Sequence, residues 1–215
     1  MNENRGMVMT GDYVAVIDAG TTGLRTMIFD LKGREIGRDY QEYESSFPKP
    51  SWVEQDANDW WNAVKETSKN VFKISKVNPA SILGICVTNQ RETIVPVDEN
   101  GMPLRKALVW QDRRSINECD WIRNEIGEDK IYEIAGLTID PYFSVTKMLW
   151  IKNNQSDIFQ KTHKFLLVHD YIEMKFTEEF VTDWSNASRT MLFDIRKNQW
   201  SEELCDQMDI SIDSI

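Results

Sequence analysis

The segment from Asp18 to Arg25 (DAGTTGLR) holds the residue types that bind a phosphate group. Its two glycines let successive backbone N–H groups converge on an anion. Thr21 and Thr22 add hydroxyl donors, and Arg25 adds a fixed positive charge. Asp18 suits a hydrated Mg²⁺ ion, which takes one or two carboxylates and keeps several waters. The same residues are also compatible with an ordinary β-hairpin turn that Asp18 caps.

A second polar segment runs from Thr88 to Thr93 (TNQRET) and separates two apolar runs. Arg91 offers a fork of N–H donors and Glu92 offers acceptors beside it, as a polyhydroxylated ligand needs. Small ligands bind at the C-terminal edge of open α/β sheets, which is where this segment is expected. The alternative interpretation is a solvated loop with a surface ion pair, which contributes little to stability.

Two further segments present aromatic rings beside polar groups. Trp110–Arg114 (WQDRR) follows an apolar run, so Trp110 is a candidate for the floor of a pocket, although its polar residues are also compatible with the start of a helix. Ile139–Ser144 (IDPYFS) places Tyr142 on a loop that Pro141 makes rigid. A tyrosine there can bind a ligand through its hydroxyl or pack with that hydroxyl satisfied.

Short apolar runs precede these segments and predict the strands that hold them. The chain begins with three runs joined by tight turns, which predict an antiparallel meander rather than a strand–helix–strand unit: 13–18, 25–31 and 35–43. Further strands are predicted at 82–88, 93–97, 104–110 and 165–168. We expect the strand over 82–88 to be buried, with its polar loop at the C-terminal end.

Helical patterns fill most of the remaining chain. Asp56 stands at an N-cap position before a stripe that includes Trp60 and Val64. Further helices are predicted at 115–126, 130–135, 145–152 and 170–176. The order of elements indicates an α/β protein whose mixed sheet is flanked by helices. Five tryptophans are expected to pack in the core or between domains: Trp52, Trp60, Trp61, Trp150 and Trp184.

Composition excludes several classes of protein. The 215 residues include 25 Lys+Arg against 35 Asp+Glu, for a net charge of −10. Nucleic-acid binding generally requires clustered basic residues, so we expect no nucleic-acid partner. We expect no membrane association either, because no apolar run approaches the roughly 18 residues of a membrane span. The first ten residues lack the apolar segment of a secretory signal.

Cysteine and histidine usage indicates a reducing compartment, the cytoplasm. Cys86, Cys119 and Cys205 are odd in number and form no CxxC pair, so we expect buried free thiols. His163 and His169 are six positions apart and do not share a helix face. This spacing argues against a helical zinc site, and the lack of a GxSxG motif argues against that class of hydrolase.

Six segments taken together resemble the FGGY family of carbohydrate kinases. They occur in the family's order: Asp18–Arg25 (DAGTTGLR), Trp52–Asp56 (WVEQD), Thr88–Thr93 (TNQRET), Trp110–Arg114 (WQDRR), Gly136–Lys147 (GLTIDPYFSVTK) and Asn186–Phe193 (NASRTMLF). The resemblance implies an actin-like, ribonuclease H-like fold of two domains with the active site between them. It also implies transfer of a phosphoryl group from ATP, with Mg²⁺, to a primary hydroxyl of a polyol or sugar, glycerol being favoured. A full-length member is expected to be a homo-oligomer.

The resemblance assigns roles to residues position by position. Asp18 would face the Mg²⁺ ion. Thr21, Thr22 and Arg25 would bind the nucleotide phosphates, and Gly23 would contribute its backbone only. The polyol hydroxyls would bind to Arg91, Glu92 and Tyr142, in a pocket lined by Trp110. The chain departs from the pattern of glycerol-phosphorylating members at Gly23, where serine is usual, and over 168–171 (VHDY).

Members of the family are longer than this chain. We therefore expect residues 1–12 to be an N-terminal extension, residues 13–215 to be the N-terminal, substrate-binding domain, and the C-terminal domain to be absent. The resemblance places the catalytic base, an aspartate, at the start of that second domain, and the surroundings of Asp206, Asp209 and Asp213 lack its motif. No catalytic residue is assigned in this chain, and alone it is expected to be nearly inactive.

Three alternatives differ in substrate or class. One is a ketose kinase such as a xylulose kinase. Another is a noncatalytic ligand-binding domain that kept the fold. The third is an actin-like or chaperone-like ATPase, which is disfavoured because such a protein has no reason to carry TNQRET and IDPYFS.

Overall fold

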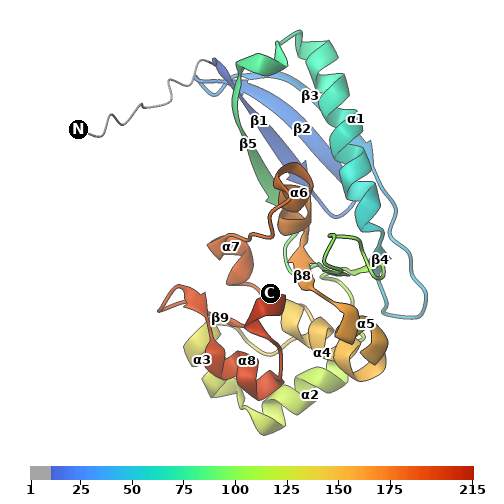
Figure 1. Ribbon diagram of the computed structural model, residues 1–215, viewed down its shortest axis with the longest axis vertical. Helices are drawn as coiled ribbons and strands as arrows, with labels where there is room; N and C mark the ends of the chain where they lie inside the picture. Colours follow the sequence, from blue (N-terminus) through green and yellow to red (C-terminus); the bar gives the residue numbers. More distant parts are fainter. Residues whose placement is uncertain (1–10) are drawn as a thin grey trace.

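Three antiparallel strands form the predicted meander at the start of the described chain, which covers residues 11–215 of a computed structural model. They are β1 (Tyr13–Ala19), β2 (Gly23–Asp30) and β3 (Glu35–Glu42). A fourth strand, β5 (Ile82–Asn89), pairs parallel with β1, which gives the order β3-β2-β1-β5. The predicted mixed sheet is therefore confirmed, and Figure 1 shows it in the upper part of the molecule.

Helix α1 (Ala57–Ser75) covers one face of this sheet (Figure 1). It begins where predicted, because the Asp56 side chain accepts a hydrogen bond from the backbone N–H of Asn58. Trp60 on α1 packs with Ile17 and Leu24 of the sheet in one apolar cluster. The Thr26 and Thr67 hydroxyls lie 2.7 Å apart and satisfy each other across this interface. The opposite face of the sheet carries the row of candidate side chains described below.

A second small sheet continues from the first. Its order is β4 (Glu54–Gln55), β7 (Ala107–Leu108), β6 (Ile94–Val97) and β8 (Lys164–Leu167). The strand predicted over 104–110 is thus reduced to two residues, and Trp110 lies in the loop after it. Helix α6 (Val168–Thr177) follows β8 directly and packs beside α1 and β5, and a short helix, α7 (Trp184–Ala187), comes next.

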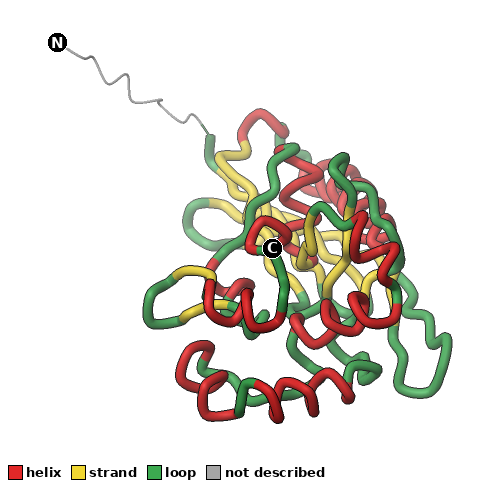
Figure 2. The backbone as a smooth tube through the Cα atoms, turned by 60° about the horizontal axis from the view of Figure 1, so that its bottom comes forward, coloured by secondary structure: helices red, strands yellow, loops and turns green. Residues whose placement is uncertain are grey.

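Helices surround a separate apolar core in the lower part of the molecule (Figures 1 and 2). They are α2 (Ile116–Glu125), α3 (Glu128–Ala135), α4 (Ser144–Asn154), α5 (Ser156–Lys161) and α8 (Glu202–Met208). A two-stranded ribbon, β9 (Phe193–Asp194) and β10 (Gln199–Trp200), joins them, and two 3-10 turns lie at Pro79–Ser81 and Ile212–Ser214. The predicted α/β class is confirmed.

Three predictions of burial are wrong, for the strand over 82–88, the Cys86 thiol and Trp184. Strand β5 forms as predicted but is an edge strand, so Ile85 is 52% exposed and the free thiol of Cys86 is exposed, while Cys119 and Cys205 are buried. Trp184 is also 69% exposed. The other four tryptophans belong to the apolar clusters, namely Trp52, Trp60, Trp61 and Trp150. Local hydrophobicity does not reveal whether a neighbouring element covers a strand or helix.

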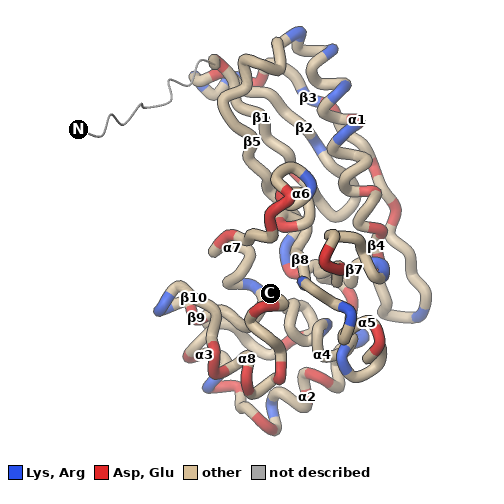
Figure 3. Tube along the Cα trace, in the orientation of Figure 1, with Lys and Arg blue, Asp and Glu red and all other residues tan. Residues whose placement is uncertain are grey.

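Positive and negative residues occur both in the part that contains the first sheet and in the helical part of the described chain. Figure 3 shows Lys and Arg residues interspersed with Asp and Glu, in keeping with the net charge of −10. No helix within residues 11–215 is long and apolar enough to span a membrane. Of the predicted N-terminal extension, residues 1–10 lie outside the described residues.

Candidate active site

Four polar side chains form a row across the first sheet on the face opposite α1. Register pairs Asp18 with Thr88 on one side and with Arg25 on the other, and pairs Arg25 with Tyr40. Directly paired residues share a face of the sheet, so the row runs from β5 through β1 and β2 to β3. The Arg25 guanidinium lies 3.7 Å from the Asp18 carboxylate and 5.7 Å from the centre of the Tyr40 ring. The row presents a carboxylate beside a cation to solvent.

The β1–β2 turn lies at one end of this row. Thr22 is exposed, Thr21 is half-buried, and the backbone N–H of Gly20 donates to the carbonyl of Gly23 at 3.0 Å. A Cβ at Gly23 would collide with the Tyr40 hydroxyl and would lie 2.6 Å from the backbone oxygen of Gln41. Position 23 therefore requires glycine rather than serine, because the Tyr40 side chain occupies the space that a Cβ atom would need.

A closed ring of hydrogen bonds connects this turn to three other segments that the sequence singles out. The indole N–H of Trp110 donates to the Thr21 hydroxyl oxygen at 2.9 Å, and its backbone N–H donates to Thr93 Oγ1 at 3.1 Å. Thr93 donates to Gln90 Oε1 at 3.2 Å, and Gln90 donates to Gln55 Oε1 at 2.8 Å. Gln55 Nε2 closes the ring by donating to the Thr21 carbonyl at 2.6 Å. Three segments distant in sequence thus fix Thr21 through hydrogen bonds to its hydroxyl and its carbonyl.

Glu92 is the centre of a second cluster. It is 1% exposed, and its Oε1 accepts from Arg189 Nε at 2.6 Å. Its backbone adopts a φ of +64°, a left-handed conformation that is uncommon for a non-glycine residue and is often found at functional sites. The interpretation of this segment as a solvated loop is wrong for Glu92, because Arg189 and the loop around it bury the carboxylate. Its ion-pair partner is Arg189 rather than the adjacent Arg91.

Tyr142 and Trp110 lie against this cluster. Their rings meet edge to face with centroids 5.4 Å apart, and the Arg189 guanidinium lies 5.9 Å from the Tyr142 ring centre. Burial, followed by the nearby charge of Glu92, raises the pKa of the Tyr142 hydroxyl, so it stays protonated as a donor. The positive charges of Arg189 and Arg91 oppose this shift, and the Arg91 residue is exposed. The structure therefore brings together the four residues predicted to contact a polyol.

A buried lysine holds the loop that carries Tyr142. Lys147 is 0% exposed, and its Nζ donates to the carbonyls of Pro141 and Tyr142, each at 2.7 Å. Burial lowers the pKa of Lys147 from 10.5 to about 7, against the opposing charges of Asp112 and Glu92. The Asp140 side chain accepts the Tyr142 backbone N–H at 2.8 Å. Both contacts fix the backbone from which the tyrosine ring projects.

The polar residues after Trp110 are structural. Asp112 is fully buried and accepts the backbone N–H of Val53 at 2.6 Å. Arg114 forms an ion pair with it at 2.8 Å and stacks over the Trp52 ring at 3.8 Å. The interpretation of this segment as a helix start is wrong, since α2 begins only at Ile116. These contacts fix the loop that positions Trp110.

Sequence reasoning missed four residues that complete the site: Tyr40, Gln55, Lys147 and Arg189. Three of them lie at or within the quoted segments, but a polar residue inside a motif gives no sign of what it contacts. Arg189 lies 97 positions from its partner Glu92, and Asn186 accepts from Asn89 across the same separation at 3.0 Å. Only the fold brings the two segments together.

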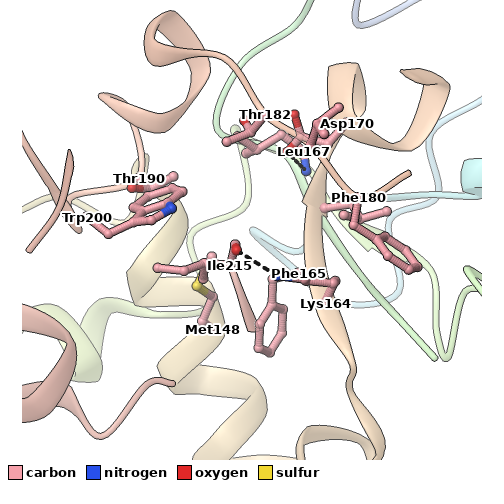
Figure 4. A pocket seen from close by; sticks show the side chains of 12 residues that line it. Met148, Lys164, Phe165, Leu167, Asp170, Phe180, Thr182, Thr190, Trp200 and Ile215 are labelled. Carbon is pink, nitrogen blue, oxygen red and sulfur yellow. Dashed lines mark hydrogen bonds between the residues drawn. The ribbon is translucent and has the colours of Figure 1, made fainter. Parts of the chain in front are cut away.

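A cavity of about 170 Å³ opens elsewhere, beside β8 and the last residue. Figure 4 shows Met148, Phe165 and Trp200 on its walls, with Lys164 donating to the backbone oxygen of Ile215. It contains none of the residues that the sequence predicts for the site. None of the residues that form the clusters around Thr21 and Glu92 lines this cavity.

Asp18 offers a single carboxylate, which suits a hydrated Mg²⁺ ion better than a dehydrated metal centre. Its side chain is 39% exposed and has only a long ion pair with Arg25, so a carboxylate oxygen is accessible. Within residues 11–215 no group of three His, Cys, Asp or Glu residues gathers as a metal cluster. The donor set therefore fits an ion held mainly by water and by a bound ligand.

Comparison with known proteins identifies the family. Residues 13–215 match the model of the FGGY family of carbohydrate kinases, N-terminal domain. The glycerol kinase of Ligilactobacillus salivarius is 41% identical over 209 residues, which are 94% of this chain and 42% of that protein. The structure is similar to that of a xyloylose kinase from Brucella ovis, with a TM-score of 0.87, 26% identity, and coverage of 94% of this chain and 42% of that one.

The Plasmodium falciparum glycerol kinase structure with ADP gives a TM-score of 0.84 at 26% identity, over 94% of this chain and 41% of that one. The chain thus spans about 42% of the length of the relatives it matches. The predicted resemblance and the actin-like fold are confirmed. The chain belongs to the FGGY family of carbohydrate kinases, whose N-terminal domain it matches from the first strand to its last residue.

Proposed function

We propose that this chain is the acceptor-binding half of an ATP-dependent kinase that phosphorylates a primary hydroxyl of a polyol, with glycerol as the favoured acceptor. The observation that carries the proposal is the contact between the two clusters. Trp110 bonds to Thr21 in the turn and packs on Tyr142 beside Glu92. A phosphate group at the turn and a hydroxyl at the acceptor cluster would therefore be neighbours, as phosphoryl transfer requires.

At the acceptor cluster we assign Arg91, Glu92 and Tyr142 to the hydroxyls. Glu92 Oε1 accepts from Arg189 Nε, and we assign the other carboxylate oxygen, beside the Tyr142 hydroxyl, to a polyol hydroxyl. The exposed Arg91 and the protonated Tyr142 hydroxyl supply donors. The Trp110 ring would contact the carbon chain. Charged acceptors in a buried setting give strong, directional bonds, which suits a small ligand with few atoms.

At the turn we assign the nucleotide phosphates to the hydroxyls of Thr21 and Thr22, the backbone of Gly23 and the guanidinium of Arg25. Asp18 would hold the Mg²⁺ ion that accompanies ATP, and the ion would neutralise phosphate charge. A local site of this kind agrees with a protein of net charge −10, which offers no broad positive field.

We assign the general base to the part of the kinase that lies outside this chain. Among the described residues, Glu92 is ion-paired with Arg189, and Asp18 lies beside Arg25 on another part of the sheet. The chain spans about 42% of its relatives, so we propose that a C-terminal domain closes over the open face. We propose the cytoplasm, where ATP is abundant, as the site of action.

A ketose kinase is the second candidate, favoured by the structural likeness to a xyloylose kinase. The full-length protein, assayed for ADP release with Mg²⁺ and ATP, separates the two. We expect glycerol to be used in preference to xylulose by roughly 10-fold or more in kcat/KM. A reversed preference would indicate the ketose kinase. No turnover with either acceptor would leave a noncatalytic ligand-binding domain and would contradict the proposed activity.

A further inference from the structure

In the hydrogen-bond ring, Trp110 donates two bonds, one from its indole N–H and one from its backbone N–H. Thr21 accepts two bonds, one at its hydroxyl and one at its carbonyl. The indole N–H reaches the Thr21 hydroxyl oxygen, while the chain of donors that starts at the Trp110 backbone N–H ends on the Thr21 carbonyl. An indole nitrogen can only donate. The Thr21 oxygen must therefore accept this bond, and its own hydrogen has to point elsewhere.

Within residues 11–215 the Thr21 hydroxyl donates to no protein group. The Thr21 residue is half-buried at the turn between β1 and β2. Its backbone is also fixed, because Gln55 Nε2 bonds to the Thr21 carbonyl at 2.6 Å and to Ser45 Oγ at 2.9 Å. The indole N–H engages one of the two lone pairs of the Thr21 hydroxyl, which keeps its hydrogen available to donate to an anion.

The other side of the Trp110 ring meets Tyr142, whose centroid lies 5.4 Å away. A ligand that moves or orders Tyr142 would therefore act on the same ring that orients Thr21. The backbone N–H of Trp110 donates to the hydroxyl of Thr93, the residue next to Glu92. A movement of Tyr142 can therefore reach the turn through two side-chain contacts, from Tyr142 to Trp110 and from Trp110 to Thr21.

We propose that Trp110 is a positioning residue that couples the acceptor pocket to the phosphate turn by orienting the Thr21 hydroxyl. This inference rests on the proposed function for the two sites but assigns Trp110 a role beyond lining the pocket. An occupied acceptor pocket fixes the indole, and the fixed indole presents the Thr21 hydrogen to a phosphate oxygen. The bond is worth one neutral hydrogen bond, so its loss should weaken phosphate binding by about 2- to 10-fold.

The direct test uses the indole N–H signals in ¹H–¹⁵N NMR spectra of the 215-residue chain, which has eight tryptophans. Trp110→Phe identifies the Trp110 signal by its loss. Thr21→Val should shift that signal, whereas Thr21→Ser, which keeps the oxygen, and Thr22→Val should leave it nearly in place. An unchanged signal in Thr21→Val would overturn the proposal whether or not any ligand binds.

The coupling is tested by titrating glycerol into the same samples. In the wild type we expect shifts at the backbone N–H groups of Tyr142 and Thr21, and in Trp110→Phe only those of Tyr142 should persist. Equal shifts at Thr21 in both proteins would overturn the proposal. If glycerol shifts nothing in the wild type, the acceptor assignment of the proposed function fails separately, while the Thr21→Val result still decides the bond.

Inorganic tripolyphosphate provides the third arm. We expect its affinity to fall by about 2- to 10-fold in Trp110→Phe and in Thr21→Val, and no further in the double variant, because both changes remove the same bond. Trp121→Phe, on the exposed side of α2, is the matched control and should bind as the wild type does. Additive losses in the double variant would contradict a shared role.

Discussion

Glu92 combines three features that are rarely found together: a buried carboxylate, an ion pair with Arg189 at 2.6 Å, and a backbone φ of +64°. Burial and a left-handed backbone each cost free energy, and the Arg189 bond offsets the desolvation of the charge. Loss of the negative charge should therefore affect both the ion pair and any ligand that the remaining oxygen binds.

We predict that Glu92→Gln lowers the affinity for glycerol by roughly 10- to 100-fold, because a hydrogen bond to a charged group contributes about 1.5–3 kcal/mol. Isothermal titration calorimetry of the chain measures the change. Glu99→Gln, in an exposed turn, is the matched control and should not alter binding. If Glu92→Gln binds glycerol as tightly as the wild type does, the assignment of Glu92 to the acceptor site is wrong.

Lys147 gives the molecule a distinct dependence on pH. Its pKa is lowered from 10.5 to about 7, so between these values the unfolded chain binds a proton that the folded chain releases. The free energy of unfolding contributed by this residue therefore rises as pH increases from about 7 towards 10.5. In Lys147→Met, which has a side chain of similar volume, this rise in the free energy of unfolding with pH should be absent.

Urea unfolding of both proteins at several pH values across this window measures the difference between their slopes. Groups that do not interact with Lys147, such as the Cys205 thiol, whose pKa burial raises to about 11, act equally in both proteins and cancel in the comparison. Identical slopes would mean that Lys147 keeps its proton when folded at these pH values.

At the scale of elements, α1 packs on the sheet that carries the β1–β2 turn. Its apolar stripe and its N-cap residue, Asp56, were predictable because both are local patterns. The exposure of Ile85 and Cys86 on β5 was not, because burial of a strand depends on which elements pack against it. The Glu92–Arg189 pair was not predictable for the same reason, since its two residues are 97 positions apart.

We predict that Asp56→Ala lowers the free energy of unfolding by about 1 kcal/mol, the usual contribution of an N-cap side chain. The Asp56 carboxylate accepts the Asn58 backbone N–H at 2.9 Å, and alanine leaves that donor to water. Chemical denaturation followed by circular dichroism measures the loss. Asp59→Ala, in the same first turn but without the capping bond, should cost less; an equal cost would indicate a charge effect alone.

At the scale of the whole molecule, two structural units meet around the site. The upper sheet supplies Asp18, Thr21 and Arg25, whereas the loops of the second sheet and α4 supply Trp110 and Tyr142. The fold was predictable from the motifs, because several of them lie at the end of an apolar strand, as Thr88–Thr93 does at the end of β5. The hydrogen-bond ring that joins them was not predictable, since it depends on the relative placement of both units.

Arg91, Glu92 and Tyr142 form the polyol-binding pocket that we propose for this chain. Glycerol titrated into the 215-residue chain and followed by ¹H–¹⁵N NMR tests it most directly. We predict saturable shifts at the backbone N–H groups of these three residues in the wild type and in Arg38→Ala, a change at an exposed arginine of β3. In Arg91→Ala the shifts should disappear while the fold and its stability stay within about 0.5 kcal/mol. Saturable shifts of the same size in Arg91→Ala, or none in the wild type, would contradict the claim.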